Sequence, residues 1–195
     1  GYGAPVAMMS QGTWDTPLGP VPLDGESGRA LADVADEDRV AHMHEHSIEV
    51  QLPFLQFLLD QFTFLPVCLA RQDHATAEAI GEAIAGIDAL PVASTDFSHA
   101  GMGYGERPPS GMTVQDWARE QDEKAIDAIQ SMDIDGFIET VREEHISMCG
   151  YGAVAAVMHA VRKNGATEAE LLTYGTSYEV HPASSCVGYA ALVFR

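Results

Sequence analysis

The residues of this chain best suited to chemistry are a carboxylate and an imidazole three positions apart, Asp96 and His99. They follow a short apolar run at 90–94, and a carboxylate at this spacing can orient and polarise the imidazole. Because a histidine exchanges its proton near neutral pH, the pair could work as a general acid or base. The same pattern also fits a structural role, in which Asp96 caps a turn and His99 packs beside it.

A cysteine supplies the second candidate. Cys149 lies directly before an alanine-rich segment at 150–163 that is predicted to be a helix. Free backbone N–H groups and the dipole at a helix start stabilise a thiolate, so Cys149 could be a nucleophile or a soft metal ligand. Gly150 and Gly152 would leave room for a ligand to approach the sulfur. The alternative is a small buried residue where the helix packs closely against the sheet.

Three histidines at alternate positions, His42, His44 and His46, form the third candidate. On an extended strand they would share one face and could hold a metal ion. On a helix, His46 and Glu49 would instead share a face at a spacing of three residues. The group also fits a solvated helix start, where Glu45 would favour the positive end of the dipole.

The predicted elements place these candidates at the ends of strands and helices. A buried strand at 90–94 would deliver Asp96 and His99 at its carboxyl end, where open α/β sheets build active sites. A helix at 45–60 would follow the histidines, with Pro53 producing a kink or a late start. The other expected elements are strands at 4–10, 63–69, 171–178 and 186–194, helices at 74–86, 113–130 and 133–143, and loops at 12–25 and 101–112, the second long enough for a lid.

Several other polar residues are predicted to have structural roles only. Thr113 is a suitable cap for the helix that follows it. The charged run at 116–124 is typical of a solvated helix face. Cys68 and Cys186 lie among apolar residues in predicted strands, so we expect them to pack as small hydrophobic side chains.

Strands alternate with helices along the chain and end in a strand pair, which predicts an α/β fold. We expect a mixed, mostly parallel sheet between two layers of helices (α/β/α). A chain of 195 residues, 46% of them hydrophobic, is long enough to bury the core of a single domain.

The charge and the cysteines restrict the partners and the compartment. A net charge of −19 repels nucleic acid and anionic membranes, and no apolar run is long enough to span a bilayer. Three widely spaced cysteines without a CxxC pair, and the absence of a signal peptide at the start of the sequence, favour a reducing cytoplasm.

The acidic residues are spread along the chain rather than gathered in a tail, which predicts a protein for a very salty cytoplasm, where salt screens the self-repulsion. We therefore expect the free energy of unfolding to rise with salt well beyond the screening of near neighbours. Unfolding measured across a salt series tests this, and equal stability at low and at molar salt would contradict it.

Four segments, in order, resemble the MEMO family, which is related to class III extradiol ring-cleaving dioxygenases of the LigB type. They extend over nearly the whole chain and are EHSIEVQLP at 45–53, STDFSH at 94–99, MCG at 148–150 and SCVGYAA at 185–191. The resemblance implies a metal site built from two histidines and the cysteine of the C-G segment, with the acid and histidine of the D-F-x-H segment beside it.

Carried onto this sequence, the resemblance makes Cys149 a metal ligand, His99 an acid/base group and Asp96 the residue that orients it. Cys149 would replace the carboxylate of a 2-His-1-carboxylate iron triad, which favours softer metals, so Fe(II) or Cu are the implied cofactors. Glu45, His46 and Glu49 would lie at or near the mouth of the pocket.

The chain departs from the family pattern at its beginning. The two ligand histidines of the family lie in a P-H-A-G segment and a G-P-x-H segment, and this sequence has neither. Its opening residues, GYGAPV, resemble the residues that come directly after the second of these segments. The resemblance therefore implies that residues 1–195 are the C-terminal two thirds of a MEMO-like domain, with an incomplete metal site and a sheet without its first strands.

Three functions remain as hypotheses. The first is a MEMO-like protein with a dioxygenase-like pocket that binds a redox metal, a small ligand or both. The second is a thiol-dependent hydrolase or acyl transferase, which requires the Cys149 sulfur within hydrogen-bond reach of His99 in a triad with Asp96. The third is a non-enzymatic binding or scaffold protein with a vestigial pocket. In each case the expected partner is a small molecule, and the sequence is compatible with a homo-oligomer.

Overall fold

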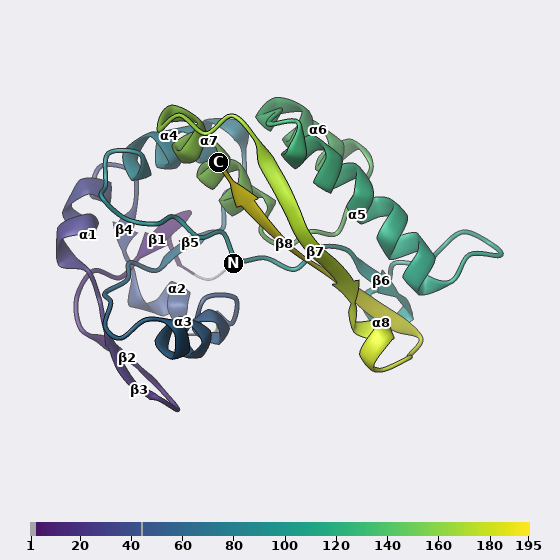
Figure 1. Ribbon diagram of the computed structural model, residues 1–195, viewed down its shortest axis with the longest axis horizontal. Coiled ribbons are helices and arrows are strands. Elements are labelled where there is room, and N and C mark those ends of the chain that lie inside the picture. Colours follow the sequence, from purple (N-terminus) through teal and green to yellow (C-terminus); the bar gives the residue numbers. More distant parts are fainter. Residues whose placement is uncertain (1–2, 44) are drawn as a thin grey trace.

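The computed structural model describes residues 3–43 and 45–195, and it groups the strands into two three-stranded sheets and a separate hairpin (Figure 1). In the first sheet β1 (Val6–Met8) is central, parallel to β4 (Asp36–Glu37) and antiparallel to β5 (Val67–Leu69). The predicted strands at 4–10 and 63–69 are therefore confirmed in shortened form.

The second sheet is antiparallel and carries the acid and imidazole motif at its edge. Its order is β6 (His99–Gly101), β8 (Ser185–Phe194) and β7 (Ala169–Thr176). The predicted strand pair near the end of the chain is confirmed. The long β8 is the central strand, so it holds both the hairpin partner β7 and the short β6.

The predicted strand at 90–94 is wrong. Within the described residues this segment joins no ladder, and the strand begins only at His99. Pro91 has no N–H to donate, and none of the described strands lies against the segment to pair with it. Asp96 consequently precedes a strand instead of following one.

The predicted loop at 12–25 contains a hairpin, which is a second correction. β2 (Thr13–Thr16) pairs with β3 (Gly19–Pro22). Gly19 adopts a φ of 114°, and the Thr16 hydroxyl donates to its carbonyl oxygen at 3.0 Å. Pro17 and Gly19, two of the residues that suggested a loop, lie at the tight turn, whereas Pro20 and Pro22 belong to β3.

The α/β class in a single domain is confirmed, with mixed strand directions. Among the strand pairs of the described residues only β1 and β4 run parallel, which differs from the mostly parallel sheet that was expected. The parallel order was expected from the alternation of strands and helices along the chain. The segment 90–94 forms no strand, and antiparallel neighbours make up most of the pairing among the described residues.

The helices agree well with the sequence pattern. Thr113 caps α5 as predicted, with its hydroxyl accepting the Asp116 N–H at 3.0 Å, and the helix at 45–60 starts late, with Pro53 in its first turn. The helical elements are α1 (Gly25–Leu31), α2 (Arg39–His42), the 3-10 turn η1 (Glu49–Gln51), α3 (Leu52–Leu58), α4 (His74–Ile84), the 3-10 turn η2 (Met102–Tyr104), α5 (Val114–Gln130), α6 (Ile134–Glu143), α7 (Tyr151–Lys163) and α8 (Ser177–Val180).

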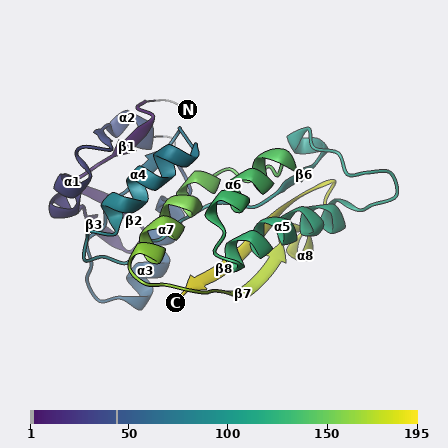
Figure 2. The same cartoon turned by 90° about the horizontal axis from the view of Figure 1, so that it is seen from above.

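The core joins the helices to both sheets. In Figure 2, α4 and α7 lie side by side, with α6 and α5 beyond them. The fully buried side chains at their contacts include Phe137, Ile80 and Met158. The buried face of α7 fixes this helix against its neighbours, and with it the position of Cys149 just before its first turn. None of the described helices has the length and apolar character needed to cross a membrane.

Candidate functional site

Two distant segments, 94–99 and 147–150, lie against each other and are joined by hydrogen bonds from backbone N–H groups to side-chain hydroxyls. The Gly150 N–H donates to the Thr95 hydroxyl at 2.8 Å, and the His99 N–H donates to the Ser147 hydroxyl at 2.8 Å. The structure therefore brings Asp96, His99 and Cys149 onto two adjoining segments.

The imidazole ring of His99 is oriented by two contacts, one at each ring nitrogen. His99 Nδ1 lies 2.8 Å from the Ser147 carbonyl oxygen, which can only accept, so Nδ1 carries a hydrogen. His99 Nε2 lies 3.4 Å from Asp96 Oδ2. The nitrogen that takes up or releases a proton therefore faces the carboxylate. The His99 side chain is 20% exposed and that of Asp96 is 46% exposed, so both can meet a ligand from solvent.

Cys149 is exposed and precedes α7, whose N-cap is Gly150. Its sulfur lies 3.4 Å from Thr95 Oγ1 and 3.9 Å from the Asp96 carbonyl oxygen. Within the described part of the chain these are its hydrogen-bond contacts, and His99 is not among them. The thiol and imidazole are thus neighbours on two adjoining segments, but the hydrogen bond that a cysteine–histidine triad requires is not formed.

The two glycines after Cys149, Gly150 and Gly152, allow other parts of the chain to pack closely against this turn. A Cβ at Gly150 would lie 2.9 Å from Thr95 Cβ, and a Cβ at Gly152 would lie 2.8 Å from Gln72 Cβ. The Gln72 side chain also bridges this turn, because its amide donates to the Cys149 carbonyl and accepts from the Gly152 N–H. The room that the sequence suggested for a ligand is filled by Thr95 and Gln72, two residues that spacing alone did not reveal.

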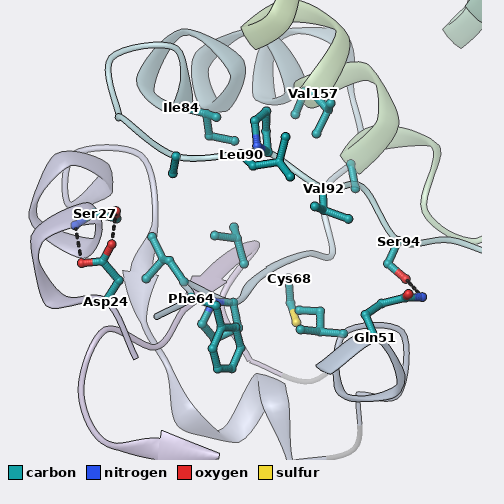
Figure 3. Close-up of a pocket in the computed structure, with 18 of the residues that line it drawn as sticks. Asp24, Ser27, Gln51, Phe64, Cys68, Ile84, Leu90, Val92, Ser94 and Val157 are labelled. Carbon is teal, nitrogen blue, oxygen red and sulfur yellow. Dashed lines mark hydrogen bonds between the residues drawn. The ribbon is translucent and has the colours of Figure 1, made fainter. Parts of the chain in front are cut away.

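A cavity of about 600 Å³ opens beside this junction (Figure 3). Cys149 and Glu45 belong to its wall, whereas Asp96 and His99 do not. Most of the wall is apolar, and Figure 3 shows Ile84 and Val157 on one side and Phe64 and Cys68 on the other. Its polar end is held together by Ser94, whose hydroxyl donates to the Ser47 carbonyl at 2.6 Å and accepts from the Gln51 amide at 3.1 Å.

Known proteins match this chain along its full length. A family model described as Memo-like protein matches residues 1–193. The chain belongs to the MEMO family. A MEMO1 family protein of Methanopyrus kandleri is 44% identical over 206 residues, which cover 100% of this chain and 69% of that relative. MEMO1 family proteins of Methanothermobacter thermautotrophicus and Thermococcus kodakarensis are 42% and 41% identical, with 98% and 100% of this chain and 69% and 72% of the relative covered.

The histidines near residue 44 of this MEMO-family protein do not share one environment, because His42 is buried and His46 is exposed. His46 precedes η1, and its Nδ1 lies 3.2 Å from Glu49 Oε1 with both side chains exposed, so the pair is solvated. Glu45 folds back and accepts the backbone N–H of Ile48 at 3.1 Å, just before η1. His42 is buried, with Nδ1 3.0 Å from the Asp38 carbonyl oxygen, and His44 lies outside the described residues.

The expected pocket residues do not all face the same space. Glu45 lines the large cavity, and Glu49 lines a separate recess beside Trp14. His46 is in neither wall. Across residues 3–43 and 45–195 no three side chains of the His, Cys, Asp and Glu types come together as a metal ligand set. Cys149, Asp96 and His99 are suitable donors for a soft or borderline ion, but by themselves they do not form the site.

Two tyrosines near the Asp96–His99 pair were not anticipated. The Tyr104 ring, in η2, packs edge-on against the imidazole with centroids 4.9 Å apart. Burial, with smaller contributions from Asp96 and Tyr104, raises the pKa of Tyr189. Tyr104, near the start of the segment 101–112, thus contacts His99, and the lid expected in this segment stays a prediction.

A buried carboxylate lies behind the motif. Asp122 of α5 is fully buried, although the run at 116–124 suggested a solvated face. Its Oδ1 accepts the Ser98 N–H at 2.8 Å and its Oδ2 accepts the Tyr174 hydroxyl at 2.7 Å. Gly188 of β8 lies against the same carboxylate, and a Cβ there would overlap Oδ2. Asp122 therefore anchors the backbone immediately before His99.

The three thiols should differ in reactivity. Burial raises the pKa of Cys68 to about 12 and also raises the pKa of Cys186, so both stay protonated near neutral pH. Cys149 is the exposed thiol. Because the thiolate is the nucleophile, iodoacetamide at pH 8 should modify Cys149 first, with Cys68 and Cys186 at least about tenfold slower. Peptide mass mapping over time tests this, and modification of Cys68 at the rate of Cys149 would contradict it.

Proposed function

We propose that this MEMO-family protein binds a small molecule in a dioxygenase-like pocket beside the junction of segments 94–99 and 147–150. The observation that supports it is the junction itself, where the Cys149 sulfur lies 3.9 Å from the Asp96 carbonyl oxygen and Asp96 faces His99 Nε2 at 3.4 Å. The adjoining cavity gives such a ligand an apolar surface, and its volume is within the range of small-molecule sites.

In this proposal His99 and Asp96 move a proton at the ligand. The Ser147 carbonyl accepts from Nδ1, which orients the ring with Nε2 toward Asp96 and leaves Nε2 as the nitrogen that can accept a proton from the ligand. When Nε2 takes a proton from an acidic hydroxyl group, the Asp96 carboxylate stabilises the imidazolium that forms. Tyr104 covers one side of the ring and limits the approach of water.

Cys149 is proposed as the sulfur donor of the site, for Fe(II) or Cu. A redox metal bound there would supply electron transfer and Lewis acidity. The described residues alone do not complete its ligand set, so binding of such an ion requires donors beyond Cys149, Asp96 and His99. We therefore assign no chemical step to a metal, and the expected partner remains a small molecule with an acidic hydroxyl group.

Ligand-dependent stabilisation tests the proposal with catechol as the probe. At a catechol concentration ten times its Kd, binding adds about 1.4 kcal/mol to the free energy of unfolding. For a chain of this size the melting temperature should then rise by about 3–6 °C. His99→Gln removes the proton acceptor and should reduce this rise by more than half. Cys149→Ser should leave catechol binding intact and abolish any binding of Cu.

His74→Gln is the matched control. His74 also contacts an acid, Asp135, but at the start of α4 and in neither of the segments 94–99 and 147–150. The His74→Gln variant should therefore show the same rise in melting temperature with catechol as the parent protein. An equal rise in the His99→Gln variant would place binding elsewhere and contradict the proposal. Oxygen uptake is measured in the same samples. Uptake above background would indicate ring cleavage, and stabilisation without uptake would indicate a pocket that binds the ligand without catalysis.

We also propose a cytoplasmic location, since three free cysteines without a disulfide fit a reducing compartment. The net charge of −19 argues against nucleic acid or an anionic membrane as a partner. A homo-oligomer is compatible with this proposal and is not required by it.

A further inference from the structure

A recess beside Trp14 lies between the β2–β3 hairpin, α2 and the turn η1 that leads into α3. Its volume is about 430 Å³, and the groups of its wall that could bind a ligand include Trp14 of β2, His42 of α2 and Glu49 of η1. None of these three side chains belongs to the wall of the large cavity. The Trp14 recess is therefore distinct from the site described above.

His42 brings an unused hydrogen-bond acceptor to the Trp14 recess. Its Nδ1 lies 3.0 Å from the Asp38 carbonyl oxygen, which can only accept, so Nδ1 carries the hydrogen and the neutral ring keeps a lone pair on Nε2. His42 is 8% exposed, and its Nε2 has no hydrogen-bond partner among the described residues. Nδ1 is turned toward the start of α2, which leaves the Nε2 side of the ring for the recess that His42 lines. Because a buried acceptor without a partner is costly, His42 favours a ligand that brings a hydrogen-bond donor.

Glu49 adds a negative charge to the same recess. Its side chain is 58% exposed, and Oε1 lies 3.2 Å from His46 Nδ1. Oε2 makes no hydrogen bond within residues 3–43 and 45–195, so this carboxylate oxygen can still accept. Asp15 is a further exposed acid of the wall, and the net charge of the protein is −19. The recess therefore attracts cations and repels anions.

Trp14 supplies an aromatic wall that is held in position from two sides. Its ring packs edge-on with His42 at a centroid distance of 5.8 Å and with Phe64 at 5.3 Å. Among the aromatic side chains, indole attracts cations most strongly. An indole, a carboxylate and an imidazole acceptor around one recess are the groups that recognise a cation rich in N–H donors.

We propose that the Trp14 recess binds an organic cation through a primary ammonium or a guanidinium group. The N–H groups of the ligand donate to His42 Nε2 and to Glu49, and its positive charge lies against the Trp14 indole. Nε2 is shielded from bulk solvent, so water competes little for its hydrogen bond. The inference goes beyond the proposed function and does not depend on it, because none of its groups belongs to segments 94–99 or 147–150.

Trp14 fluorescence tests the proposal with agmatine, which carries a guanidinium and a primary ammonium group, and with n-butylammonium. The chain contains two tryptophans, so the Trp117→Phe variant leaves Trp14 as its only indole. At a constant ionic strength of about 0.15 M, Trp14 emission should change saturably with both ligands, with a Kd of about 1 mM. Tetramethylammonium, a cation without donors, should bind about tenfold more weakly.

Two variants of the Trp117→Phe protein identify the binding groups. Glu49→Gln removes the charge of an exposed side chain and should raise the Kd for agmatine about fivefold. His42→Phe keeps an aromatic ring beside Trp14, removes the Nε2 acceptor and should raise the Kd to a similar extent, about fivefold. Glu26→Gln is the matched control, because Glu26 is an exposed acid on α1 outside the recess wall, and it should leave the Kd unchanged.

The inference would be overturned if neither agmatine nor n-butylammonium changed Trp14 emission saturably. Glu49→Gln with the parental Kd, or an equal effect of Glu26→Gln, would show that only the diffuse negative charge attracts these cations. Since Glu49 is exposed, this comparison decides the matter even where His42→Phe alters folding. Agmatine should leave the catechol-dependent rise in melting temperature unchanged. Absence of that rise with intact agmatine binding would contradict the proposed function and support this inference.

Discussion

Replacement of Asp122 by alanine should lower the free energy of unfolding by about 3 kcal/mol. The change leaves two buried donors, the Ser98 N–H and the Tyr174 hydroxyl, without their acceptor, and each costs about 1–3 kcal/mol. It also opens a void in a fully buried position. Urea unfolding measures this loss, provided that the dependence of the free energy of unfolding on urea concentration is the same in the variant and the parent.

The matched control is Asp127→Ala, an exposed acid on the same helix, which should change stability by less than about 0.5 kcal/mol. Asp122→Asn keeps the shape and can still accept from Ser98 and donate to Tyr174, so its loss should be much smaller. An asparagine variant as unstable as the alanine variant, or an alanine variant as stable as the parent, would contradict the anchoring role.

The pH dependence of the same residue follows from its burial, which raises the pKa of the Asp122 carboxyl above its usual 3.8. The folded state therefore binds this proton more tightly than the unfolded state. The stability that Asp122 contributes in this way is complete below pH about 4 and is lost as the pH rises through the folded-state pKa. Asp122→Asn should remove this component from the pH profile of unfolding.

Gly81→Ala should cost about 3 kcal/mol, although alanine is the better helix former by about 1 kcal/mol. Gly81 lies in α4 where it crosses α7, and a Cβ there would lie 2.6 Å from the Ala156 carbonyl oxygen and overlap His159 Cβ. Both obstacles are part of the neighbouring helix, so α4 and α7 must separate. Thermal or urea unfolding measures the loss.

Gly86→Ala provides the comparison, because its nearest neighbour would be the Ala83 carbonyl oxygen at 3.5 Å, an ordinary contact. That variant should be as stable as the parent. Since α7 carries Cys149 at its start, separation of the helices in Gly81→Ala should also change the rate of Cys149 alkylation. A Gly81→Ala protein with parental stability would show that the close crossing of the two helices does not constrain the fold.

The sequence predicted what depends on neighbours along the chain. Thr113 caps α5, Cys149 precedes α7, and the long helices follow the apolar spacing of their residues. Capping and periodicity act within one or two turns, so the local pattern contains the required information. The motif residues Asp96 and His99 could be selected for the same reason, because their spacing is itself local.

Only the tertiary structure decided which polar groups are buried and which extended segments become strands. Asp122 looks like one acid in a charged run, yet its partners Ser98 and Tyr174 come from distant parts of the chain. The segment 90–94 has the composition of a strand but lies beside a cavity with no paired neighbour among the described residues. A ladder or a buried hydrogen bond requires a partner far away in the chain, and a local pattern does not contain that partner.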